Sequence, residues 1–127
     1  ECAGAHGVVI PKRRSVGLTA IVGKASAGAL EYMPVARVTN ITNAIKELKE
    51  RGVWIFGTAA EGATPLYQAD LKGAAAIVIG NEGDGMSRLV AESCDLKVSI
   101  PMKGRISSLN ASAAAAILLY EAVRQRG

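Results

Sequence analysis

Two loops rich in glycine and small polar residues carry the residue types that could do chemistry in this chain. The first spans residues 80–86 (GNEGDGM), and the second spans residues 107–112 (SSLNAS). Each loop follows a short apolar run and precedes a helical pattern. Small molecules bind at the carboxyl ends of the strands in open α/β sheets, where such loops lie. The sequence therefore predicts a binding site that both loops form together.

The glycine spacing of the first loop is G-x-x-G-x-G, which differs from the dinucleotide-binding pattern G-x-G-x-x-G. Glycines can adopt positive φ and let the backbone approach a ligand closely. Glycines alone are also typical of a tight connection between a strand and a helix. Glu82 favours a site, because a carboxylate inside such a turn can orient a cation or accept a hydrogen bond from a ligand.

The second loop precedes the last helix of the chain, and either Ser107 or Ser108 is expected to cap that helix. Asn110 then falls in the first helical turn, which helix propensity does not favour but ligand contact would. Backbone N–H groups at a helix start can bind a carboxylate or a phosphate. Thr58-Ala59 ends another strand, either as an ordinary turn or as a third loop of the same site if the strands are neighbours.

Short apolar runs alternate with helical patterns along the whole chain, and this alternation is typical of an α/β domain with a largely parallel sheet. Strands are expected at 8–10, 35–38, 53–56, 74–79 and 96–100. Helices are expected at 20–27, between a cap at Asn40 and a stop at Gly52, at 86–93 and at 108–126. Residues 61–73 are expected to form a loop or an irregular segment, because Pro65 and Gly73 interrupt regular structure. The small side chains of residues 111–116 predict that the last helix is buried, with a subunit interface as one reason. No domain boundary is evident.

The composition describes one globular domain of 127 residues, half of them apolar and a fifth charged. We expect no membrane-spanning helix and no signal peptide. The net charge of +4 permits contact with nucleic acid without requiring it. Its denser basic spots are Lys12 to Arg14, Lys103 with Arg105, and Arg124 with Arg126, each of which also fits a solvated surface. Cys2, Cys94 and His6 show no metal-ligand spacing, which favours a reduced, cytoplasmic protein without a metal.

Residues 79–86, together with residues 100–102 and 107–112, resemble the second and third motifs of the SpoU (TrmH-like) RNA ribose methyltransferases. The resemblance covers essentially the whole chain, including residues 23–29 and the strand that contains Trp54. The sequence is most similar to the bacterial enzymes that methylate a guanosine ribose 2′-hydroxyl in large-subunit ribosomal RNA.

This resemblance implies a parallel α/β sandwich with a deep C-terminal trefoil knot of the SPOUT type, present as a homodimer. Residues 1–127 would be its catalytic domain, which transfers a methyl group from S-adenosylmethionine to RNA. The cofactor would be held by residues of all three loops, namely Thr58, Ala59, Gly80, Asn81, Gly83, Ile100, Met102 and Leu109. Glu82, Ser108 and Asn110 would line the reacting end as catalytic residues.

The chain departs from the family at the first motif, whose Asn and Arg precede the first helix and whose Arg is assigned to activation of the ribose hydroxyl. Arg13, Arg14 and Arg37 stand in other contexts. We therefore expect a chain truncated at its amino-terminal end, without the first strand, and the absence of that Arg leaves open whether the chain is active by itself. One alternative is a non-catalytic dimeric fragment that binds cofactor or RNA, and another is a tRNA substrate. A nucleotide-binding domain unrelated to methylation lacks its usual phosphate fingerprints.

Overall fold

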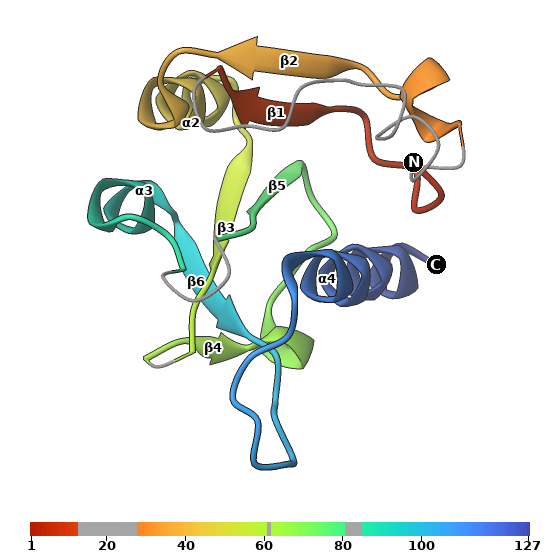
Figure 1. Ribbon diagram of the computed structural model, residues 1–127, viewed down its shortest axis with the longest axis vertical. Coiled ribbons are helices and arrows are strands. Elements are labelled where there is room, and N and C mark those ends of the chain that lie inside the picture. Colours follow the sequence, from red (N-terminus) through yellow and green to blue (C-terminus); the bar gives the residue numbers. More distant parts are fainter. Residues whose placement is uncertain (13–27, 61, 81–84) are drawn as a thin grey trace. The chain divides into compact units, whose positions relative to one another are not determined.

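The computed structural model describes residues 1–12, 28–60, 62–80 and 85–127. These residues form two compact units, Glu1–Ala44 and Ile45–Gly127, and each is described by itself (Figure 1). The helix expected at 20–27 lies outside the described residues.

The first unit contains a pair of short parallel strands, β1 (Val8–Pro11) and β2 (Val35–Val38). The 3₁₀ turn η1 (Ala29–Glu31) precedes β2. Pro11, which cannot donate a hydrogen bond to a ladder, is the last residue of β1, as expected from its chemistry. The predictions of strands near 8–10 and at 35–38 are thereby confirmed.

Helix α2 (Ile41–Glu50) begins and ends where the sequence predicts. The Oδ1 of Asn40 accepts a hydrogen bond from the backbone N–H of Asn43 at 3.1 Å, which is an N-terminal cap. Gly52 follows the helix with a φ of 86°, a left-handed conformation that stops the helix and that glycine adopts without strain.

The second unit is built on a four-stranded sheet with the order β4-β6-β3-β5, in which every neighbouring pair is parallel (Figure 1). The strands are β3 (Trp54–Thr58), β4 (Thr64–Pro65), β5 (Ala75–Val78) and β6 (Leu96–Ser99). The prediction of an α/β fold with parallel strands is confirmed. Because β5 and β6 flank β3, the carboxyl ends of these three strands are neighbours.

The core of the second unit lies between this sheet and the last helix. Its buried side chains come from the sheet, the last helix and the segment between β3 and β5, and they include Phe56, Leu66, Leu71, Val98 and Leu118. The stretch at 62–73, expected to be a loop or irregular, is largely irregular, but it also contains two short elements that the sequence did not predict, β4 and the 3₁₀ turn η2 (Leu66–Gln68). Burial of apolar side chains orders a stretch whose local sequence is dominated by turn residues.

Two helices begin later than the sequence predicts. Helix α3 (Arg88–Ser93) starts after Ser87, whose Oγ accepts from the backbone N–H of Val90 at 3.3 Å. Helix α4 (Ala111–Arg126) starts after Asn110 and not at Ser108. Leu118 and Glu121 of α4 are buried within the unit, so part of the expected burial of this helix needs no partner subunit.

None of the helices in the described ranges is long and apolar enough to cross a membrane. The trefoil knot and the homodimer stay predictions from the resemblance.

Candidate functional site

The carboxyl end of β3 is tied to both of its neighbours. The Oγ1 of Thr58 donates to the backbone oxygen of Val78 in β5 at 3.2 Å. The backbone N–H of Ala59 donates to the oxygen of Val98 in β6 at 3.0 Å. These bonds place residues 58–59 between the strands that lead into the two glycine-containing loops. The strand order meets the condition under which the three loops were expected to converge, because β5 and β6 are both neighbours of β3.

Gly80 stands where the chain leaves β5 and folds closely back on itself. A Cβ added at this position would lie 2.5 Å from the carbonyl carbon of Gly85 and 2.6 Å from the backbone nitrogen of Met86. Both neighbours are backbone atoms, so they cannot move aside as a side chain would. Gly85 has a φ of 70°, which also favours glycine. Two glycines of the motif are thus required by the loop itself, whether or not a ligand binds.

Asn81, Glu82 and Gly83 lie outside the described residues.

Gly57 is a position that the sequence analysis missed. A Cβ added there would lie 2.7 Å from the Sγ of Cys94 and within 3 Å of the end of the Met86 side chain. A glycine inside a strand often marks such a close approach, and this signal was present in the sequence. The side chains of Met86 and Cys94 therefore pack directly against Gly57, next to Thr58 at the carboxyl end of β3.

Cys94 acts here as a packing group. Its Sγ donates to the backbone oxygen of Val90 at 3.3 Å. Burial raises the pKa of the Cys94 thiol above its ordinary value, and the charge of Lys97 opposes this only in part. The thiol is therefore protonated near neutral pH, and it lacks the thiolate form that a nucleophile needs.

The loop between β6 and α4 is held by few interactions. Within the part of the chain that the structure describes, no hydrogen bond joins the backbone of residues 101–109 to another group. Ile100 is half-buried against the core, whereas Met102 and Leu109 are each 39% exposed and Ile106 is 77% exposed. This loop offers backbone donors and acceptors beside apolar side chains, which is the surface that a planar heterocycle needs for binding.

Asn110 caps α4, which corrects the prediction of a serine cap. Its Oδ1 accepts from the backbone N–H of Ala113 at 2.7 Å, and its carbonyl oxygen accepts from Ala114 at 3.0 Å. Because Oδ1 takes the backbone hydrogen bond, Nδ2 is left with two N–H groups, and no acceptor for them lies among the described residues. Ser107 and Ser108 are exposed and precede the cap.

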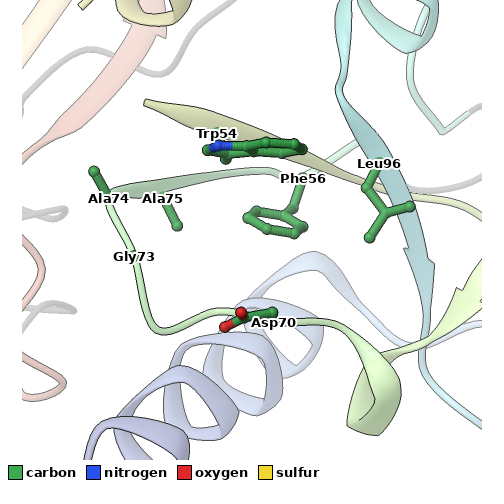
Figure 2. Close-up of a pocket in the computed structure, with 7 residues that line it drawn as sticks. All are labelled: Trp54, Phe56, Asp70, Gly73, Ala74, Ala75 and Leu96. Atoms are coloured by element: carbon green, nitrogen blue, oxygen red, sulfur yellow. The ribbon is translucent and has the colours of Figure 1, made fainter. Parts of the chain in front are cut away.

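A hollow of about 330 Å³ lies at the opposite end of the same sheet (Figure 2). Figure 2 shows the rings of Trp54 and Phe56 on the same side of β3, with Asp70 across the hollow. Its lining includes Trp54, Ala75 and Leu96, the first residues of β3, β5 and β6. Because the strands are parallel, this hollow lies at their amino ends, and the converging loops lie at their carboxyl ends. The hollow is therefore separate from the candidate site.

In the described ranges, no group of three His, Cys, Asp or Glu side chains is arranged to hold a metal ion.

Comparison with known proteins identifies the class that this sheet and these loops define. Residues 1–120 match the model of the SpoU rRNA Methylase family. The chain therefore belongs to the SpoU family.

Two relatives show how similar the sequence is. The chain is 55% identical over 126 residues to the 23S rRNA (guanosine-2′-O-)-methyltransferase RlmB of Shewanella oneidensis. It is 52% identical over 126 residues to the enzyme of the same name from Ralstonia nicotianae. Each match covers 99% of this chain and 51% of the relative, so the chain spans about half the length of these proteins.

Solved structures agree on the fold. The SpoU methyltransferase AviRb from Streptomyces viridochromogenes, in complex with AdoMet, matches with a TM-score of 0.90 and 34% identity over 98% of this chain and 49% of that chain. The A. aeolicus TrmH/SpoU tRNA modifying enzyme matches with a TM-score of 0.89 and 29% identity over 98% and 64% of the two chains. The fold is thus that of the SPOUT methyltransferases.

Proposed function

We propose that residues 1–127 form the catalytic domain of an S-adenosylmethionine-dependent RNA methyltransferase that modifies a ribose 2′-hydroxyl. A guanosine of large-subunit ribosomal RNA is the proposed target, since the relatives at 55% and 52% identity carry that activity in their names. The observation that carries the proposal is the strand order, which makes the carboxyl ends of β3, β5 and β6 neighbours, in a chain that matches the SpoU family model over residues 1–120.

The groups around these strand ends fit an adenosine-containing cofactor. Residues 101–109 have backbone donors and acceptors with no partner among the described residues, and an adenine edge needs both kinds of group. Ile100, Met102 and Leu109 supply apolar surface for the ring. The proposed binding set is Thr58, Ala59, Gly80, Asn81, Gly83, Ile100, Met102 and Leu109.

The bound cofactor supplies an activated methyl group, so the protein contributes mainly by positioning the acceptor oxygen. Asn110 suits this task because its Oδ1 is held by the Ala113 N–H, leaving Nδ2 to donate to a ribose or phosphate oxygen. Ser108 is an exposed hydroxyl two residues earlier. We assign Glu82 to orienting a cationic group at the ribose, whose hydroxyl must lose its proton as the new bond forms. Only RNA offers that hydroxyl.

We further propose that the active form is a homodimer in the cytoplasm, where ribosomal RNA is modified. The small side chains at 113–115 of α4 are partly exposed and would permit a second chain to approach closely.

The first test is a calorimetric titration of this chain with S-adenosylhomocysteine. We expect saturable binding at one site per chain, because the loops that would hold the cofactor are all present. A folded sample that does not bind would contradict the assignment of the cofactor to these loops.

The second test incubates the chain with radiolabelled S-adenosylmethionine and transcripts of 23S rRNA, tRNA or the matching DNA. Nucleoside analysis of the product is expected to show 2′-O-methylguanosine from the rRNA and no labelled DNA. Label in tRNA would assign the substrate class of the A. aeolicus relative. Cofactor binding without transfer to any RNA would favour the non-catalytic binding module.

A further inference from the structure

Two cations stand at the tip of the loop between β6 and α4. Lys103 and Arg105 are both exposed and flank Gly104, where an added Cβ would meet no atom within 4 Å. The loop surface at this point therefore faces open space.

These two cations differ from several others on the same unit, which are paired with carboxylates. Lys49 lies 3.5 Å from Asp95, and Arg88 lies 2.9 Å from Glu92. Among the residues with described positions, neither Lys103 nor Arg105 has a carboxylate within ion-pair distance. With respect to the described carboxylates, the charge of both side chains is available to an anion from outside the chain.

The position of the pair limits which anion can bind. Arg105 precedes Ser108 by three residues and Asn110 by five, and five extended residues span at most about 17 Å. A chain of phosphates that passes the proposed reacting end therefore comes within reach of both side chains. Arginine can bind a phosphate through two parallel hydrogen bonds, and lysine acts as a point charge.

We propose that Lys103 and Arg105 form a phosphate clamp, which binds the RNA backbone beside the nucleotide to be methylated. The inference rests on the proposed function and names a substrate contact that the family motifs do not carry. The same anion chemistry could be supplied by the carboxylate of the cofactor, so the test must separate the two sources.

The experiment compares wild-type chain, a Lys103→Ala/Arg105→Ala variant and a charge-matched control, Lys46→Ala/Lys72→Ala. Lys46 and Lys72 are exposed and lie on α2 and on the segment before β5. Binding of a fluorescein-labelled single-stranded RNA of mixed sequence is followed by anisotropy from 50 mM to 1 M salt. Binding of S-adenosylhomocysteine to each protein is measured by calorimetry, and the fluorescence of Trp54, the single tryptophan, checks folding.

Each phosphate contact on a single strand contributes about 0.7 to the slope of log affinity against log salt, which is roughly eightfold in affinity between 1 M and 50 mM. We expect the clamp variant to lose about 1.4 from the slope and to bind RNA roughly sixtyfold more weakly at 50 mM. The control variant should lose less than about threefold, and the affinity for S-adenosylhomocysteine should be equal in all three proteins.

Three results would overturn the clamp. Equal losses of RNA affinity in the clamp and control variants would mean a general charge effect. A loss of S-adenosylhomocysteine affinity with unchanged RNA affinity would assign the cations to the cofactor carboxylate. Absence of RNA binding by the wild type would contradict the proposal of a clamp. Methyl transfer and cofactor binding by the wild type are scored separately, so the proposed function stands or falls independently of the clamp.

Discussion

The two ends of helix α4 are held in very different ways. At the carboxyl end, the side-chain amide of Gln125 accepts from the backbone N–H of Leu71 at 2.7 Å and donates to the oxygen of Ala69 at 2.8 Å. Arg126 donates to the oxygens of Leu71 and Gly73 at 3.2 and 2.6 Å. This end is bound to the segment before β5 by its own side chains.

At the amino end, Asn110 caps the helix. The residues before it, 101–109, make no backbone hydrogen bond within the described part of the chain. One helix thus separates two tasks. Its carboxyl end fixes the helix on the core, whereas the residues that precede its amino end, 101–109, offer backbone groups that bond to no other described residue. Loops that bind ligands are commonly drawn from the less stable parts of a fold for this reason.

The largest expected effect is on stability at the carboxyl end. Gln125→Leu leaves the N–H of Leu71 and the oxygen of Ala69 without their side-chain partner, which should lower the free energy of unfolding by about 2–4 kcal/mol. Urea unfolding followed by Trp54 fluorescence measures this within the second unit. The matched variant at the other end, Ile106→Ser, should change stability by less than about 0.5 kcal/mol, because Ile106 is 77% exposed. Equal effects would contradict the separation of tasks.

The next effect separates capping from chemistry at Asn110. Asn110→Ala removes the cap and should cost about 1 kcal/mol of stability. Asn110→Asp keeps an oxygen for the Ala113 N–H and should preserve stability, yet it replaces the donor by a negative charge. We expect both variants to reduce methyl transfer about a hundredfold. Affinity for S-adenosylhomocysteine should fall much less, and equal losses of turnover and affinity would count against the role assigned to Asn110.

The smallest effect is confined to acidic pH. Glu121 is buried, and hydrogen bonds from Arg124 at 2.6 and 2.9 Å and from Gln125 at 2.8 Å lower the pKa of its carboxyl from 4.5 to about 2. A carboxyl with a lowered folded-state pKa contributes stability above its unfolded pKa and loses it as the pH falls.

Thermal unfolding between pH 6 and pH 2 tests this contribution. We expect stability to decline progressively between about pH 4.5 and pH 2. Glu121→Gln should show a shallower decline over that window, with a lower stability at pH 6. A variant that follows the wild-type profile would mean that other carboxyl groups control acid unfolding.

Much of this protein was determined by local sequence. The alternation of apolar runs and helical patterns predicted a parallel α/β fold, and the cap at Asn40 and the stop at Gly52 were readable because they act within one turn of the chain. The motif residues 79–86, 100–102 and 107–112 indicated the family, which the match over residues 1–120 confirms. The roles of the individual site residues stay predictions.

The tertiary structure decided what depends on partners distant in the chain. Residues 64–73 hold their conformation because Leu66 and Leu71 are buried and Gln125 binds their backbone from more than fifty residues away. The need for glycine at 57 arises from Cys94 and Met86, which no local pattern places beside it. Ser108 and Asn110 are both good caps by composition, and only the three-dimensional path of the loop selects between them. A local hydrogen bond depends on residues that are neighbours in the sequence, whereas burial and close approach between distant residues arise only when the chain folds.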